Sequence, residues 1–124
     1  MKLILAVIRI AKMGETKQAL AEVGLPSFTA MPVLGRGQGR GDFASVKAAV
    51  TIDDDVPVVA DGPSRLKAKR MITLVVTDEK KDLAIETLLK VNSTGKSGDG
   101  KIMVVNTLDS YTVHNGLSGD ASLD

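Results

Sequence analysis

Hydrophobic and polar positions divide the chain into two similar halves, each with a strand, a helix and a second strand. Four short apolar runs, rich in β-branched residues, predict the strands: 3–8, 28–34, 71–76 and 102–105. Pro32 lies inside the second run, which places that strand at a sheet edge or a bulge. The order β-α-β, long connection, β-α-β predicts an α+β, ferredoxin-like βαββαβ fold with a four-stranded antiparallel sheet.

Apolar residues at helical spacing predict one helix in each half. The first covers 12–23 and ends before Gly24, where a C-cap glycine belongs, and before Pro26. The second starts after Asp78, a candidate N-cap, and runs to about 91. The residues expected to face the core are Met13, Ala19, Leu20 and Val23 in the first helix, and Leu83, Ala84, Leu88 and Val91 in the second.

Two segments lack such a pattern. Residues from about 35 to 66 are expected to form a long projecting loop, and loops of this length are usually functional. The small, polar residues 115–124 form a C-terminal tail that is expected to fray. The predicted folded unit is therefore one domain over 1–114 that carries the long loop.

Composition narrows the partner classes. The 16 basic and 15 acidic side chains nearly cancel, and only 2% of residues are aromatic, so nucleic-acid binding is not expected. There is no cysteine for disulfides or thiolate metal sites. No apolar run approaches the roughly 20 residues of a membrane helix, so we expect a cytoplasmic protein without membrane insertion. Two helices cover only one face of the sheet, and oligomerisation is expected to cover the other.

A glycine-rich stretch stands between the second helix and the last strand. Residues 94–102 read TGKSGDGKI, with three glycines within six residues and two flanking lysines. Such backbone can turn several N–H groups toward an anion, while Lys96 and Lys101 add charge. The spacing is not that of a Walker A loop, and an ordinary turn is the alternative. A second glycine and arginine run, residues 35–41, strengthens the case for phosphate binding.

His114, the only histidine, raises the question of catalysis because imidazole titrates near neutrality. No carboxylate motif accompanies it, so an enzyme is not expected. A nucleotide phosphotransferase or hydrolase would need His114 for product formation.

The stretch TGKSGDGKI resembles the C-terminal signature of the PII nitrogen-regulatory proteins, except that Met103 stands where Phe or Trp is usual. ALAEVG at 19–24 and the glycine run at 35–41 also resemble PII, in the right order and spacing. The long, glycine- and arginine-rich central loop, which corresponds to the PII T-loop, resembles the NifI branch that acts on nitrogenase. The resemblance implies a trimer with nucleotide clefts between neighbouring chains.

The resemblance also implies site residues for ATP or ADP. Those expected around the phosphates are Gly35, Gly37, Gly98, Asp99, Gly100 and Lys101. Thr29 and Val75 are expected near the base, and Lys69 matches the lysine that pairs with a carboxylate of 2-oxoglutarate.

Two departures from the family pattern stand out. The glutamine that helps hold Mg and 2-oxoglutarate should fall at Gly39, whereas this chain has Gln38, which is the candidate metal ligand. Thr112 and His114 replace two arginines that clamp the nucleotide phosphates, so a homotrimer should bind ATP weakly. A paralogue in a mixed oligomer would be able to supply them.

The expected function is that of a non-enzymatic nitrogen-regulatory sensor. Adenine nucleotide, with 2-oxoglutarate as a second candidate ligand, would change the long loop and its affinity for a protein target, for which nitrogenase is favoured. The alternative is a PII-like trimer with ADP or AMP preference that regulates a transporter or another enzyme.

Overall fold

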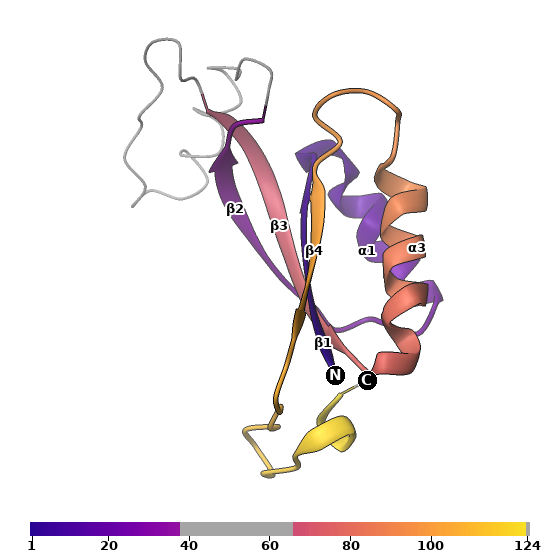
Figure 1. Ribbon diagram of the computed structural model, residues 1–124, viewed down its shortest axis with the longest axis vertical. Helices are drawn as coiled ribbons and strands as arrows, with labels where there is room; N and C mark the ends of the chain where they lie inside the picture. The colour runs from indigo at the N-terminus through magenta and orange to yellow at the C-terminus, as the bar shows by residue number, and fades with distance from the viewer. Residues whose placement is uncertain (38–65, 124) are drawn as a thin grey trace.

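The computed structural model describes residues 1–37 and 66–123, which form one α+β unit (Figure 1). The strands are β1 (Lys2–Ile8), β2 (Thr29–Gly35), β3 (Lys67–Val76) and β4 (Lys101–Asn106). Helix α1 (Met13–Glu22) follows a short 3₁₀ turn, η1 (Ile10–Lys12), and α3 (Lys81–Asn92) follows η3 (Asp78–Lys80). The predicted βαββαβ order is confirmed. Most of the predicted long loop, residues 38–65 with Gln38 and Gly39, lies outside the described residues, and Gly35 belongs to β2.

The sheet is antiparallel with the order β2-β3-β1-β4. In register, Leu5 lies between Thr73 of β3 and Met103 of β4, and Val33 of β2 lies opposite Lys69. Strand β2 is an edge strand, as the proline within it predicts, because proline has no backbone N–H to donate to a neighbouring strand.

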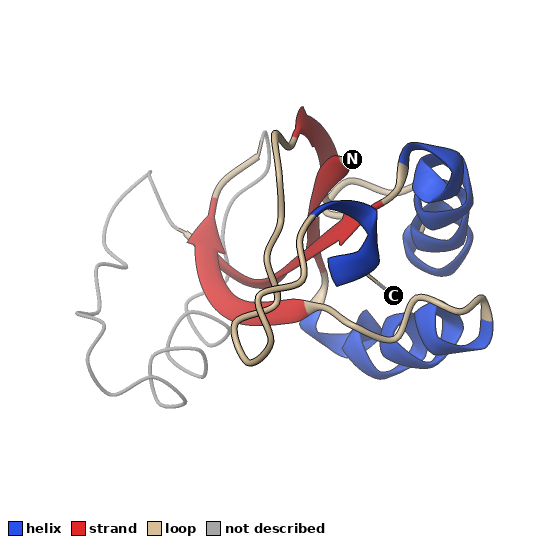
Figure 2. Cartoon of the chain, turned by 90° about the horizontal axis from the view of Figure 1, so that it is seen from below, coloured by secondary structure: helices blue, strands red, loops and turns tan. Residues whose placement is uncertain are grey.

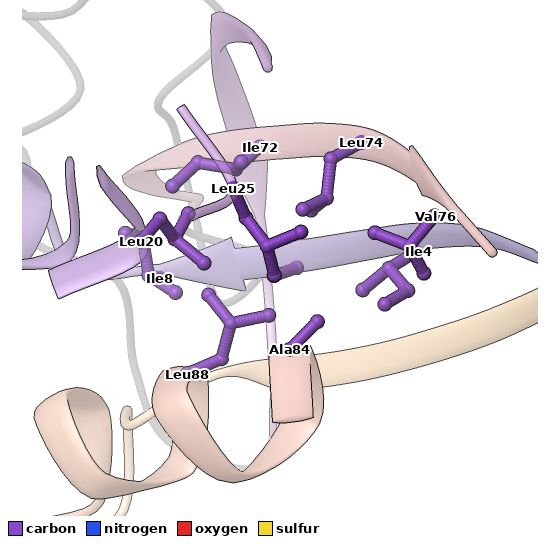
Figure 3. Close-up of a cluster of buried hydrophobic side chains, with 10 residues drawn as sticks. Ile4, Ile8, Leu20, Leu25, Ile72, Leu74, Val76, Ala84 and Leu88 are labelled. Atoms are coloured by element: carbon purple, nitrogen blue, oxygen red, sulfur yellow. The ribbon is translucent and has the colours of Figure 1, made fainter. Parts of the chain in front are cut away.

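Helices α1 and α3 lie together on one face of the sheet (Figure 1). Alternate residues of β1 and β3 point into this layer, where they meet the helices (Figure 3). The buried apolar cluster consists of Ile4, Ala6, Ile8, Leu20, Leu25, Ile72, Leu74, Val76, Ala84 and Leu88. The fully buried side chains of this cluster are thus aliphatic, in keeping with the scarcity of aromatic residues, and Phe28 packs against them.

The two helices also share a buried polar contact that the apolar pattern did not predict. The amide of Asn92 donates to the Thr16 hydroxyl at 3.1 Å and to the Leu88 carbonyl at 3.0 Å. The Thr16 hydroxyl donates in turn to the Lys12 carbonyl at 2.7 Å. Because these buried polar atoms are paired, they fix the contact between α1 and α3 without a desolvation penalty.

Two predictions for the second helix are wrong in detail. Leu83 is exposed, whereas Ala84 and Leu88 are fully buried, so the inward face is narrower than the pattern indicates. Asp78 does not cap a helix: its carboxylate accepts the N-terminal amine of Met1 at 2.6 Å. The start of β1 lies beside the end of β3, which brings the N-terminal amine close to Asp78. The full positive charge of this amine competes for the carboxylate better than backbone N–H groups do.

Neither α1 nor α3 covers the second face of the sheet (Figure 1). In the register, Leu3, Leu5 and Val7 of β1 share this face with alternate residues of β3 and β4. Met31, Met103 and Val105 are exposed by 41–47%. An apolar face of this kind is typical of a surface that another chain covers.

The C-terminal tail is folded, contrary to the expectation that it frays. Tyr111 and Ser118 form an antiparallel bridge, and η4 (Gly119–Ser122) follows it. Asp109 accepts the backbone N–H of Gly119 at 3.0 Å, which closes the turn. This segment crosses the end of the sheet (Figure 2).

Candidate functional site

The glycine loop (residues 93–100) joins α3 to β4, and its conformation depends on its glycines. Gly95, Gly98 and Gly100 have φ of +80°, +96° and +103°, a region that other residues rarely adopt. A Cβ on Gly100 would lie 1.7 Å from the Val7 carbonyl oxygen. Gly100 therefore lets the loop return directly against β1, which brings its backbone to the end of that strand.

Asp99 anchors the glycine loop from within. Its carboxylate accepts the backbone N–H of Thr94 at 2.7 Å and of Gly95 at 3.0 Å, and also the Thr94 hydroxyl. Arg9, which directly follows β1, pairs with the same carboxylate and donates to the Ser97 carbonyl at 3.0 Å. The Thr94 hydroxyl and the Arg9 guanidinium hold the pKa of Asp99 well below its usual range. Asp99 is thus ionised at neutral pH and shapes the loop.

Three cations converge on Gly98. A Cβ at that position would lie 3.2 Å from an Arg9 guanidinium nitrogen, 3.6 Å from the Lys67 ammonium and 3.8 Å from the Lys69 ammonium. Lys69 donates to the Gly98 carbonyl and is only 8% exposed. Burial lowers the pKa of Lys69, and the charges of Lys67 and Arg9 lower it further, while Asp99 opposes them. We call Arg9, Lys67 and Lys69 the cation cluster. Its positive charge exceeds that of its single carboxylate, which favours an anionic ligand.

Other predicted phosphate residues lie near this end of the sheet. Lys101 begins β4 opposite Val7 and lines a groove of about 470 Å³ between α3 and β4, together with Asp99 and Gly100. Gly35 ends β2 opposite Lys67. Gly37 follows two residues later, with open space around it, and Gln38 lies outside the described residues.

Thr29 and Val75 meet elsewhere, in a pocket of about 300 Å³ at the opposite end of the sheet. We call it the Thr29 pocket; its lining residues are Leu3, Ser27, Phe28, Thr29, Thr73, Leu74, Val75, Ser122 and Leu123. Thr29 and Gly35 begin and end the seven-residue β2, so they lie about 20 Å apart at 3.3 Å per residue. A single chain therefore does not bring the predicted base residues and phosphate residues together.

The residues at the two arginine positions belong to the folded tail. The Thr112 N–H donates to the Leu117 carbonyl, and the Gly116 N–H donates to the Thr112 carbonyl, both at 2.8 Å. His114 lies exposed in this turn. Neither side chain offers the paired donors of a guanidinium toward a phosphate.

Sequence reasoning missed Arg9 and Lys67. Both flank strands that it did identify: Arg9 follows β1 directly, and Lys67 begins β3. Since β1 and β3 pair with Ile8 opposite Arg70, the end of β1 lies beside the start of β3. This register is the signal that places Arg9 near the basic residues 67 and 69.

The described residues were also searched for clusters of metal ligands and for membrane-spanning helices. Across 1–37 and 66–123, no three His, Asp or Glu side chains lie together as metal ligands. In the same part of the chain, no helix is long and apolar enough to cross a membrane.

Comparison with known proteins identifies the family of the chain. The family model of nitrogen regulatory protein P-II matches residues 1–116. Similar full-length relatives include the nifHD region GlnB-like protein 2 of Methanococcus maripaludis, 38% identical over 99% of this chain and 100% of the relative. The corresponding protein of Methanothermobacter marburgensis is 39% identical over the same shares. Nitrogen regulatory protein P-II of Klebsiella oxytoca is 32% identical over 99% of this chain and 100% of its own length.

The glycine loop and its cations therefore lie within the matched region, and the nifHD region relatives indicate the NifI branch. Proteins of this family are signalling regulators that act on protein targets, not enzymes. The chain belongs to the P-II family of nitrogen regulatory proteins.

Proposed function

We propose that this protein senses adenine nucleotide through the glycine loop and passes the signal to a protein target through the long loop that follows β2. The observation that carries the proposal is the convergence of the cation cluster on Gly98. Three cations share one carboxylate there, and Arg9 already pairs with it. Backbone N–H groups and an uncompensated positive charge suit the phosphates of ATP or ADP.

The nucleotide site is shared between chains. The glycine loop of one chain supplies the phosphate contacts, and the Thr29 pocket of its neighbour supplies the base contacts. This arrangement accounts for the distance between Thr29 and Gly35 in one chain. It also uses the apolar sheet face that α1 and α3 leave uncovered, as a closed trimer would.

The second ligand in this proposal is 2-oxoglutarate, with Lys69 as the cation for one carboxylate and Gln38 as the side-chain ligand of Mg. Lys69 fits this role because it is buried and already donates to the Gly98 carbonyl. A carboxylate at this point would offset part of the excess positive charge of the cation cluster.

Nitrogenase is the target that we favour. The support comes from relatives that are named for the nifHD region of nitrogen fixation genes. Binding of nucleotide next to Gly35, where the long loop begins, would change the conformations open to that loop and hence its affinity for a partner.

In a mixed oligomer, the absence of arginine at positions 112 and 114 of this chain would weaken ATP binding least. Methanococcus maripaludis has both a nifHD region GlnB-like protein 1 and a protein 2, which are each 38% identical to this chain. A paralogue would be able to supply an arginine pair where Thr112 and His114 stand in this chain.

The loss of that pair also favours a second candidate function. Without two guanidinium groups, a nucleotide with fewer phosphates loses less affinity, so the protein would prefer ADP or AMP and regulate a transporter or another enzyme. Its assembly would be the same trimer.

Calorimetric titration of the purified protein with ATP, ADP and AMP, each with and without Mg and 2-oxoglutarate, separates these functions. We expect ATP to bind, and 2-oxoglutarate to strengthen its binding. A preference for AMP or ADP would support the second function, and binding of no nucleotide by the protein or its mixed oligomer would contradict both.

A further inference from the structure

Two polar side chains occupy core positions on the facing sides of the two helices. Thr16 lies on the inward face of α1, between Met13 and the buried Leu20. Asn92 lies one turn after the buried Leu88 on α3. Thr16 is fully buried, and Asn92 is only 7% exposed. Because an apolar pair would fill these positions without desolvating any polar group, packing alone does not account for the two residues.

A series of hydrogen bonds leads from Asn92 to the segment that follows β1. The Asn92 amide donates to the Thr16 hydroxyl at 3.1 Å, and this hydroxyl donates to the Lys12 carbonyl at 2.7 Å. The Lys12 N–H donates to the Arg9 carbonyl at 3.0 Å. Hydrogen bonds are directional, whereas apolar contacts are not. The series therefore fixes the position of α3 along α1 more strictly than apolar packing would.

The glycine loop starts directly after Asn92 and returns into β4 (Figure 1). Its later residues are held by the same segment, because Arg9 pairs with Asp99 and donates to the Ser97 carbonyl at 3.0 Å. The loop is thus fixed to the segment after β1 at two points. Thr16 and Asn92 fix its start, and the Arg9 side chain fixes its far part.

A shift of α3 along α1 would move the start of the loop while the far part stayed with Arg9. The first backbone groups affected would be the N–H groups of Thr94 and Gly95, which lie two and three residues after Asn92. They donate to the Asp99 carboxylate at 2.7 and 3.0 Å. These two hydrogen bonds therefore report whether the start and the far part of the loop are in register.

We propose that Thr16 and Asn92 are positioning residues for the phosphate site: their hydrogen bond sets where the glycine loop leaves α3 relative to Arg9. Asn92 also lines the groove of about 470 Å³ that contains Lys101. The inference rests on the proposed nucleotide function for its ligand, whereas the position of the loop can be measured without any ligand.

The test removes the hydrogen bond in three ways. Thr16→Val keeps the shape of threonine, Asn92→Leu replaces the amide with an apolar group, and the double variant has an apolar pair. Each single variant leaves one buried polar group with a partner fewer, so the urea midpoint of unfolding should fall. The double variant should recover most of this loss, because neither polar group of the pair remains.

The position of the loop is measured by hydrogen exchange of the Thr94 and Gly95 amides, followed by NMR on the whole chain without ligand. We expect their protection to fall at least about tenfold in both single variants and also in the double variant. ATP affinity, measured by calorimetry, should fall about fivefold or more in the same three variants. Thr16→Ser keeps the hydroxyl and should retain both the protection and the ATP affinity.

Thr87→Val is the matched control on α3. The Thr87 hydroxyl donates to the Leu83 carbonyl at 2.7 Å, which is the same kind of bond as that of Thr16 to Lys12, but it is exposed and stays within α3. Its loss should change neither the protection of the loop amides nor the ATP affinity.

Loop protection that recovers together with stability in the double variant would overturn the inference, because a merely structural pair acts on the loop only through overall stability. Unchanged loop protection in Thr16→Val would overturn it as well. The ATP titrations separate the two proposals. Loss of loop protection in the variants of a protein that binds no nucleotide would contradict only the nucleotide function. ATP affinity that the double variant retains would contradict only the positioning role.

Discussion

At one end of the sheet, three cations and a carboxylate crowd around Gly98; at the other end, the Thr29 pocket is lined by hydroxyl and apolar side chains. The same strands supply both ends, because β1 and β3 run the length of the sheet. The charged end suits a phosphate and the other end suits a base. The proposed function therefore assigns the phosphates of the nucleotide to one end and its base to the other.

The two ends of the sheet thus differ in the part of a ligand that each can bind. The cation cluster needs an anion to balance it, whereas the Thr29 pocket offers shape and few polar groups. Because β2 separates the ends by about 20 Å, our proposal has a neighbour bring its Thr29 pocket to this chain's glycine loop. The following predictions test the two ends separately.

The largest effect is expected from Gly100→Ala. Its φ of +103° and the 1.7 Å approach to the Val7 carbonyl leave no space for a Cβ. We expect a loss of about 3–5 kcal/mol of unfolding free energy and no ATP binding, measured by urea denaturation and calorimetry.

Gly95→Ala is the matched control for Gly100→Ala. Gly95 also has a positive φ, but a Cβ there meets nothing within 4 Å, so the cost should be about 1–2 kcal/mol. Equal losses in the two variants would contradict the role of the close approach to β1.

Lys101→Ala should act on the charged end without unfolding the protein. Lys101 is exposed at the start of β4, so its ammonium is available to bind an anion and contributes little to packing. We expect ATP affinity to fall at least about tenfold by calorimetry, with the melting temperature nearly unchanged. Unaltered ATP affinity would count against a phosphate site at this loop.

Thr29→Phe should act on the opposite end. Thr29 is exposed in β2, where an aromatic residue is compatible with a strand, and the larger ring would fill the Thr29 pocket. We expect ATP affinity to fall about fivefold or more while methyl phosphate still binds, since only the base is excluded. Loss of both ligands would show that the two ends do not act independently.

The smallest effect is a change in acid stability. The folded pKa of Asp99 lies below its ordinary value of 3.8, so its contribution is present above that pH and is lost as the pH falls below it. Asp99→Asn should therefore flatten the decline of unfolding free energy between about pH 4 and pH 2, measured by urea denaturation.

Asp78→Asn is the comparison at the other end of the sheet, where the N-terminal amine lowers the pKa of Asp78. It should flatten the same decline less, because Asp99 accepts from several donors of the loop as well as from Arg9. A steeper curve for Asp99→Asn than for the wild type would contradict the assigned pKa direction.

The sequence allowed much of the fold to be predicted, because the spacing of apolar residues and the positions of proline and glycine are local features of the chain. Pro32 indicated an edge strand, and Leu20 and Leu88 lie in the core as their spacing predicts. Leu83 and Asp78 were misassigned because the width of a buried face and the proximity of the N-terminus depend on tertiary packing.

The site could be predicted only where chemistry is concentrated in sequence. The glycines and Asp99 stand together in one loop, so their association was visible. Arg9 and Lys67 join them only through the register of β1 against β3, and that register is set by the whole apolar face. The separation of Thr29 from the glycine loop is likewise a property of the folded sheet.

Subunit complementation tests the shared site most directly. Lys101→Ala and Thr29→Phe are each weak in ATP binding alone, but a site formed by the glycine loop of Thr29→Phe and the pocket of Lys101→Ala is intact. When the two variants are unfolded together and refolded as a 1:1 mixture, we predict that about a quarter of the wild-type sites return, as counted by calorimetry. A mixture that binds no better than the two variants refolded separately would contradict a site built from two chains.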